Sequence, residues 1–336
     1  QETLQVSIVR ILIELPTWLG DAVMASPAIE NILDYYKGSE VILIGSPVSI
    51  SVLENHPRVK RTFIFKKKYL SLLIQSISLG RFDVYFSFRS SIRSKLFKSI
   101  IQSKSKYQFD HKDYKDIHQV KKYNNFVNDS LGRVLKAGKL KLYNSSENDT
   151  QDLSDFFEGL PQFNNSKLLG INPGASYGNS KCWYPREYAK VAANLSKFYD
   201  ILIFGNSSDE AVSKDIEKSL IEQGVTNFNN LTGKTSITEL LGIISKLDLF
   251  ITGDSGPMHV SAAYQIPTVA IFGPTRDHET SQWMNEKSII VKKNLDCQPC
   301  MKRRCPLGHH NCMKLIKAEE IVTNVKSQML GQLNDI

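Results

Sequence analysis

The stretch that decides the fold is FITGDSGPMHVSAA, residues 250–263. Its apolar start predicts a buried strand, its polar glycine-containing middle predicts a tight turn, and Pro257 suits the first turn of a helix. The free N–H groups at such a helix start favour an anion. Asp254 and His259 flank this start, which suggests a sugar or nucleotide rather than bare phosphate. An ordinary connection in which Asp254 only caps the helix is equally compatible with these residues.

Strands and helices alternate on both sides of this stretch. The first half predicts strands at 8–15, 41–44, 61–65 and 82–88, helices at 22–36 and 70–78, and a loop at 104–116. The second half predicts strands at 168–172, 200–204 and 268–272, and helices at 185–198, 208–223 and 236–246. A polar break between 144 and 166 predicts two domains, 1–160 and 161–336. The expected fold is α/β, with two doubly wound Rossmann-like domains that face a central cleft.

Size and composition narrow the class of protein. A chain of 336 residues, 41% of them hydrophobic, is expected to form two soluble globular domains. We find no apolar run long enough to cross a bilayer and no signal-peptide pattern at the start. Five cysteines, four of them clustered, favour a reducing, cytoplasmic setting over a secreted disulfide framework.

The net charge of +8 is concentrated in the first half of the chain. Between residues 58 and 122, about 17 Lys or Arg stand against about 4 Asp, which indicates an anionic partner. Nucleic acid, a membrane surface and a phosphorylated glycolipid all fit this charge, and so does a merely solvated basic face. The expected absence of interleaved exposed aromatic residues and the uncharged donor loops argue against nucleic acid.

Two more loops that follow predicted strands carry polar residues. In the loop 16–21, Asp21 opens a helix, where an N-cap is the commoner role. The loop 172–185 offers hydroxyls, free N–H groups and the ammonium of Lys181, which together can surround a diphosphate. Neither loop has the glycine spacing of a nicotinamide-binding fold or of a P-loop. A long surface loop without function is the alternative for residues 172–185.

An acidic pair and a missing motif complete the picture of a nucleotide site. Asp209 and Glu210 follow the predicted strand 200–204, and either could accept hydrogen bonds from ribose hydroxyls. The sequence contains no Asp-x-Asp motif, which argues against a divalent metal on the diphosphate. Lys181 and helix N-termini would then stabilise a departing diphosphate.

Three stretches together resemble one family: LPTWLGDAVM (15–24), NPGASYGNSKCWYP (172–185) and TGDSGPMHVSAA (252–263). They are similar to the ADP-heptose:lipopolysaccharide heptosyltransferases of glycosyltransferase family 9, which are inverting enzymes of the GT-B fold. The resemblance covers nearly the whole chain. The cysteine-rich stretch 297–312 resembles heptosyltransferase II more than heptosyltransferase I.

The resemblance implies roles for individual residues. Asp21 matches the carboxylate proposed as general base. The residues that match the donor-binding positions are Ser176, Lys181, Asp209, Glu210, Thr235, Asp254, Ser255, Gly256 and His259. Only one of Asp209 and Glu210 is expected to contact the ribose. The last helix, 318–330, is expected to pack back on the N-terminal domain.

Two further clusters have candidate roles. The expected ligands of the acceptor's phosphates are Lys66, Lys67, Lys68, Arg89, Arg93 and Lys95. The cysteines that could hold a structural zinc are Cys297, Cys300, Cys305 and Cys312. Their spacing is unusual for common zinc ribbons, and free or buried thiols are the alternative.

The expected function is a cytoplasmic, inverting heptosyl transfer that needs no metal or other cofactor for catalysis. It would move L-glycero-D-manno-heptose from ADP-heptose to the first heptose of a lipid A–Kdo–heptose acceptor. The basic N-terminal half would rest on the inner face of the inner membrane, and no nucleic acid is involved. The alternatives are heptosyltransferase I or III activity, a sugar-nucleotide epimerase of the same fold, and a non-catalytic anion-binding protein.

Overall fold

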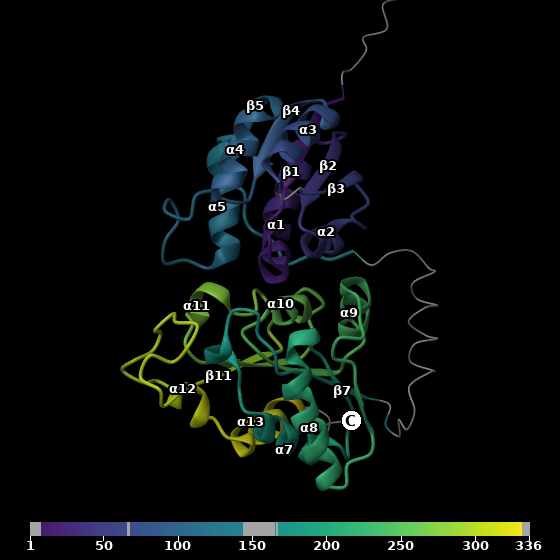
Figure 1. Ribbon diagram of the computed structural model, residues 1–336, viewed down its shortest axis with the longest axis vertical. Helices are drawn as coiled ribbons and strands as arrows, with labels where there is room; N and C mark the ends of the chain where they lie inside the picture. The colour runs from purple at the N-terminus through teal and green to yellow at the C-terminus, as the bar shows by residue number, and fades with distance from the viewer. Residues whose placement is uncertain (1–7, 66–67, 144–164, 166, 331–336) are drawn as a thin grey trace, which may run out of the picture. The chain divides into compact units, whose positions relative to one another are not determined.

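The computed structural model describes residues 8–65, 68–143, 165 and 167–330 (Figure 1). The chain divides into two compact units, Gln1–Tyr143 and Asn144–Ile336. The boundary predicted near residue 160 lies between 144 and 164, outside the described residues. Each unit is built on a parallel sheet with intervening helices, so the prediction of two Rossmann-like α/β domains is confirmed.

The first unit contains a five-stranded parallel sheet in the order β3-β2-β1-β4-β5. Its elements are β1 (Arg10–Glu14), α1 (Leu19–Tyr35), β2 (Glu40–Gly45), α2 (Pro47–Leu53), β3 (Val59–Ile64), α3 (Tyr69–Leu79), β4 (Arg81–Ser87), α4 (Ile92–Ile100), β5 (Gln102–Gln108) and α5 (Gln119–Leu131). Helix α1 packs beside α2 and α5, whereas α3 packs beside α4. In the central strand β1, Ile11, Leu12 and Ile13 are fully buried, as expected for a parallel strand covered on both faces.

Strand β5 occupies part of the stretch 104–116, for which we predicted a loop, so that prediction was wrong for residues 104–108. The strand reads QSKSKYQ and pairs in parallel with β4 at one edge of the sheet. Backbone N–H and C=O groups make this pairing, and an edge strand needs few apolar side chains. Its polar sequence therefore gave no apolar signal of a strand.

The second unit contains a six-stranded parallel sheet in the order β11-β10-β9-β6-β7-β8. Its elements are β6 (Leu168–Asn172), η1 (Asn179–Lys181), α7 (Pro185–Leu195), β7 (Asp200–Ile203), η2 (Ser207–Asp209), α8 (Glu210–Glu222), β8 (Phe228–Asn230), α9 (Ile237–Ile244), β9 (Leu249–Gly253), α10 (Gly256–Ala263), β10 (Thr268–Phe272), α11 (Asp277–Thr280), β11 (Ser288–Lys292), α12 (Asn311–Lys314), α13 (Ala318–Val325) and η3 (Lys326–Leu330). The strands and helices predicted for this half are confirmed, with end residues that differ by a few positions. We did not predict β8 and β11, which are the two edge strands.

The last helix α13 packs against α7, and its buried residues Ile321, Val322 and Val325 belong to the core of the second unit. We expected this helix to return to the N-terminal domain. The part that the structure describes belongs to the second unit, because its apolar face is buried in that core. Among the helices of the described residues, none is long and apolar enough to cross a membrane.

Candidate active site

The strand order of the second unit determines where its candidate ligand site lies. From β6 the chain adds β7 and β8 on one side, and from β9 it adds β10 and β11 on the other. Because β6 and β9 are neighbours, the loops that follow them meet at the switch point, where doubly wound sheets bind ligands. These loops, 172–185 and 253–256, are the ones that the sequence predicted to hold a diphosphate.

One amide side chain joins the two loops. Asn172, the last residue of β6, donates from Nδ2 to the carbonyl of Gly174 (3.2 Å) and to the hydroxyl oxygens of Thr252 (3.3 Å) and Ser255 (3.2 Å). Ser255 is the N-cap residue of α10, and Gly256 is its first residue. The N-terminus of α10 is thus held beside the loop 172–185, which brings the positive end of the helix to the switch point.

Lys181 and Asp254 form a buried ion pair at this point. Lys181 Nζ lies 2.6 Å from Asp254 Oδ2, and the two side chains are 12% and 5% exposed. The hydroxyl of Thr275 also donates to Asp254 Oδ2 (2.7 Å), and the Lys181 ammonium lies 4.8 Å from the ring centre of Tyr177. The carboxylate of Asp254 therefore holds the ammonium of Lys181 in place. His259, on α10, is buried at 3% exposed.

Asp209 and Glu210 point to different surroundings. The carboxylate of Asp209 accepts the backbone N–H of Asn206 (2.9 Å), and burial raises its pKa. It lies so close to Gly174 that a Cβ there would sit 2.3 Å from the Asp209 carboxyl group. Glu210 is exposed and pairs with Lys214 at 3.7 Å. Of these two acids, Asp209 is the one that contacts the loop 172–185.

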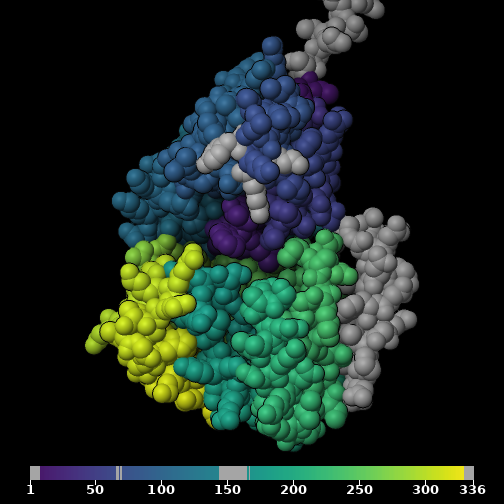
Figure 2. All heavy atoms as spheres, in the orientation of Figure 1, coloured from purple at the N-terminus to yellow at the C-terminus, as the bar shows by residue number. Residues whose placement is uncertain are grey.

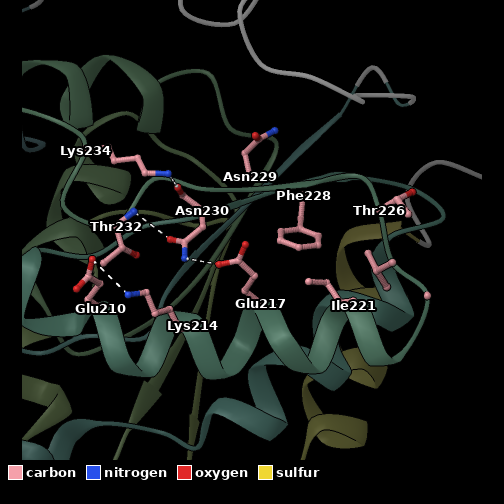
Figure 3. A pocket seen from close by; sticks show the side chains of 12 residues that line it. Glu210, Lys214, Glu217, Ile221, Thr226, Phe228, Asn229, Asn230, Thr232 and Lys234 are labelled. Atoms are coloured by element: carbon pink, nitrogen blue, oxygen red, sulfur yellow. Dashed lines mark hydrogen bonds and ion pairs between the residues drawn. The ribbon is translucent and has the colours of Figure 1, made fainter.

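A groove of about 500 Å³ runs between α8 and the β8 strand (Figure 3). Phe228 and Asn230 line it from the strand side, and Glu210, Lys214 and Glu217 line it from the helix. Among the predicted donor residues, only Glu210 lines this groove, which lies at the edge of the sheet and not at the switch point.

Two predicted donor residues lie in exposed or half-buried loop positions. Ser176 is exposed in the loop 172–185, and Thr235 is half-buried immediately before Ser236, the N-cap of α9. Both hydroxyls lie in loops that follow parallel strands, β6 and β8. They therefore lie, like Lys181, on the side of the sheet where the strands have their C-terminal ends.

The cysteine-rich segment supports the loop that carries Lys181. The hydroxyl of Tyr177 donates to the carbonyl of Met301 (2.7 Å), and the hydroxyl of Ser180 donates to the carbonyl of Lys302 (2.5 Å). A ring nitrogen of His310, Nε2, lies 2.9 Å from the Ser180 carbonyl oxygen. We did not predict this support, because these bonds join residues more than 120 positions apart and use backbone carbonyls that any sequence has.

The four clustered cysteines line one small cavity of about 20 Å³. Burial raises the pKa of Cys312 to about 11, whereas the backbone N–H of His310, 3.4 Å from the Cys305 sulfur, helps to lower the pKa of that thiol. Across the described ranges, no three His, Cys, Asp or Glu side chains are gathered as metal ligands would be. A structural zinc held by Cys297, Cys300, Cys305 and Cys312 therefore stays a prediction.

Asp21 lies in the first turn of α1, after the central strand of the first unit. The hydroxyl of Tyr123 donates to its Oδ1 at 3.3 Å, and burial together with the Asp21 charge raises the pKa of Tyr123 well above its usual value. The positive end of the helix favours the ionised carboxylate. Trp18, the N-cap residue, precedes Asp21 by three positions and is 62% exposed.

A buried carboxylate also holds a cation in the first unit. Glu14, fully buried at the end of β1, accepts hydrogen bonds from Tyr85 (2.5 Å), Ser87 (2.6 Å) and Ser94 (2.6 Å). Glu14 also forms an ion pair with Arg89, whose Nη1 lies 3.6 Å from Glu14 Oε1 and whose side chain is 14% exposed. Four partners satisfy this buried charge, which would otherwise be costly.

The predicted acceptor-binding residues are therefore not equivalent. Arg89 is mostly buried against Glu14, Arg93 is half-buried, and Lys95 is exposed and lies 3.9 Å from Asp110. Lys68 is exposed at the start of α3, whereas Lys66 and Lys67 lie outside the described residues. All the described members of this set follow β3 or β4, so they lie at the same edge of the sheet as the loop of Asp21.

Comparisons with known proteins identify the family of this chain. The family model for glycosyltransferase family 9 (heptosyltransferase) matches residues 95–311. Lipooligosaccharide heptosyltransferase 2 of Campylobacter jejuni is 43% identical over 323 residues, which cover 95% of this chain and 98% of that protein. The protein of the same name from Haemophilus influenzae is 25% identical over 84% of this chain and 88% of its own.

Among solved structures, the ADP-heptose lipopolysaccharide heptosyltransferase II of Escherichia coli has a TM-score of 0.79 and 20% identity, covering 96% of this chain and 99% of that chain. The likeness extends over both parallel-sheet units, so the fold is of the GT-B class. The sequence matches go further, and the chain belongs to glycosyltransferase family 9, the heptosyltransferases.

Proposed function

We propose that this protein transfers L-glycero-D-manno-heptose from ADP-heptose to the first heptose of a lipopolysaccharide or lipooligosaccharide inner core. The observation that carries the proposal is the buried pair of Lys181 and Asp254 beside the N-terminus of α10. A cation held at a helix start suits a diphosphate, and a nucleoside diphosphate is what an ADP-sugar releases. The 43% identical relative is named as a heptosyltransferase 2, which supports the choice of acceptor.

In this proposal the second unit binds the donor. The diphosphate contacts the ammonium of Lys181, the N-terminus of α10 and the exposed hydroxyl of Ser176. Asp209 accepts hydrogen bonds from the ribose, because its carboxylate faces the loop 172–185 and Glu210 does not. Asp254 acts as a positioning residue that keeps Lys181 in place.

The reaction is a single displacement that inverts the anomeric carbon. Asp21 takes the proton of an acceptor hydroxyl as its oxygen forms a bond to the anomeric carbon of the heptose. The bond from that carbon to the β-phosphate oxygen of ADP breaks in the same step, and the electron pair leaves with ADP. Lys181 and the helix dipole stabilise the growing negative charge, so we propose that catalysis needs no metal or other cofactor.

The first unit binds the acceptor. The phosphates of the acceptor contact Lys68, Arg93 and Lys95. Arg89 adds positive charge without direct contact, because Glu14 holds its guanidinium. The exposed indole of Trp18 lies beside Asp21 and suits stacking on the acceptor heptose. Because this acceptor is a lipid, we propose that the protein works in the cytoplasm, at the inner face of the inner membrane.

One experiment tests the function. The protein is incubated with ADP-heptose and with core acceptors that carry no, one or two heptoses, and the products are weighed by mass spectrometry. We expect one heptose to be added only to the acceptor with one heptose, and EDTA to leave the rate unchanged. Extension of a different acceptor would instead indicate heptosyltransferase I or III activity. Turnover of the sugar nucleotide without any acceptor would favour the epimerase and contradict the proposal.

A further inference from the structure

Helix α3 exposes a stripe of large apolar residues. Leu70, Leu73, Ile74 and Ile77 are 73%, 45%, 61% and 69% exposed. These positions follow the spacing i, i+3, i+4, i+7, so they lie on one face of the helix. In a surface helix of a globular protein this stripe normally faces the core. Here it faces outward, since all four side chains are exposed. Helix α3, which connects β3 to β4 along the chain, lies at the surface of the first unit (Figures 1 and 2).

The opposite face of α3 is buried although it contains polar residues. Leu72 and Leu79 belong to the core of the first unit, and Gln75 and Ser76 are buried between them. Gln75 Nε2 donates to the carbonyl of Ile64 (2.8 Å), and the Ser76 hydroxyl donates to the carbonyl of Leu73 (2.7 Å). The buried polar groups therefore have hydrogen-bond partners. Packing of the core does not explain why the large apolar residues of α3 are exposed.

The charged residues at the ends of α3 and within α4 are all basic, and one of them, Lys95, lies 3.9 Å from the carboxylate of Asp110. Helix α3 contains no charged residue, and the exposed side chains of Lys68 and Arg81 stand at its two ends. Helix α4, which packs beside it, exposes Ile92 (82%) and Leu96 (39%). The charged residues of α4 are Arg93, Lys95 and Lys98, with no acid among them.

We propose that this surface, formed by the exposed residues of α3 and α4 and here termed the α3–α4 face, docks on an anionic lipid bilayer. The stripe of α3 lies in the plane of the interface, with its apolar side chains at the acyl boundary and the basic residues among the headgroups. The proposal deepens the proposed function, since a lipid-linked acceptor lies on such a bilayer.

A second copy of the chain is the main competing occupant. A two-fold dimer through this face would bring the same basic residues of both copies together around the contact. The like charges would repel, whereas anionic headgroups complement them. The charge pattern therefore favours the bilayer over a homodimer.

The test measures flotation of the full chain with vesicles. One set contains phosphatidylethanolamine and phosphatidylglycerol, and the other contains phosphatidylcholine only. We expect binding to the anionic vesicles that weakens as salt rises, and much weaker binding to the neutral ones. The variant Ile74→Gln/Ile77→Gln should lower the partition coefficient about 100-fold, since burial of one such side chain corresponds to about a tenfold change.

The matched control is Ile221→Gln, a helical isoleucine that is 62% exposed in the second unit. We expect it to bind vesicles as the unchanged protein does. Both variants should keep the unchanged melting temperature, because the altered side chains are exposed. Equal vesicle binding by the double variant, or no binding by the unchanged protein, overturns the proposal. A dimer that the double variant dissociates, without vesicle binding, would assign the face to a second copy and overturn it as well.

A parallel assay separates this inference from the proposed function. Heptose transfer from ADP-heptose to a delipidated core acceptor should be equal for the unchanged protein and the double variant. If neither transfers heptose while vesicle binding behaves as expected, the proposed function fails and the membrane face stands. If both transfer heptose and neither floats with vesicles, the proposed function stands and the proposal of a membrane-docking face fails.

Discussion

Replacing Asp254 with alanine should destabilise the second unit by about 3–5 kcal/mol, because it leaves a buried ammonium without its partner. Lys181 Nζ lies 2.6 Å from the carboxylate, and its side chain is 12% exposed. The hydroxyl of Thr275 also loses its acceptor, which adds about 1 kcal/mol. Domains are stable by only about 5–15 kcal/mol, so this loss is large. Asp254→Asn keeps an acceptor oxygen and should cost less.

The measurement is urea unfolding followed by tryptophan fluorescence, to which the buried Trp183 of the second unit contributes. Lys181→Met and the double variant complete a thermodynamic cycle with Asp254→Ala. Each single variant leaves one buried charge, and the double variant leaves none. The double variant should therefore lose about 1–3 kcal/mol less than the sum of the single losses. Single losses that add within about 0.5 kcal/mol would refute the idea that the pair holds the loop.

Three more predictions address the first unit. Asp21→Asn should slow heptose transfer about 10²- to 10⁴-fold. ADP binding, measured by calorimetry, should stay unchanged. Full activity of this variant would show that Asp21 is not the general base. Trp18→Ala should raise KM for the acceptor about 2- to 10-fold and leave KM for the donor unaltered, whereas equal changes in both would argue against stacking. Burial raises the pKa of Glu30, but hydrogen bonds from His56, Tyr143 and Lys141 outweigh it and lower the pKa from 4.5 to about 2. Glu30 thus adds stability above pH 4.5 that is lost as the pH falls toward 2, and Glu30→Gln should flatten the urea midpoints across that window.

The sequence could predict the βα alternation and the loops of the site because both signals are local. An apolar run such as Leu249–Gly253 is typical of a parallel strand that is buried on both faces, and the polar residues after it lie at the C-terminal end of that strand. The edge strand β5 escaped prediction because its sequence is mostly polar, whereas the edge strand β3 was predicted. Periodicity also predicted the helix at 70–78 correctly, but period alone does not say which face is buried. In α3 the tertiary fold buries Gln75 and exposes Ile74.

The sequence could not reveal that a buried acidic residue pairs with a basic residue of each predicted site. In the second unit Asp254 holds Lys181, and in the first unit Glu14 holds Arg89 across 75 positions of sequence. The motif suggested that Asp254 binds the donor, and Glu14 had no motif at all. Both acids are almost fully buried. Each one holds its cation in one orientation and balances part of the positive charge before any ligand binds. A phosphate that binds there meets a cation already in position, and the ordering cost has been met during folding. For this reason, variants of the two acids should weaken anion binding in their own unit, although neither acid needs to touch the ligand.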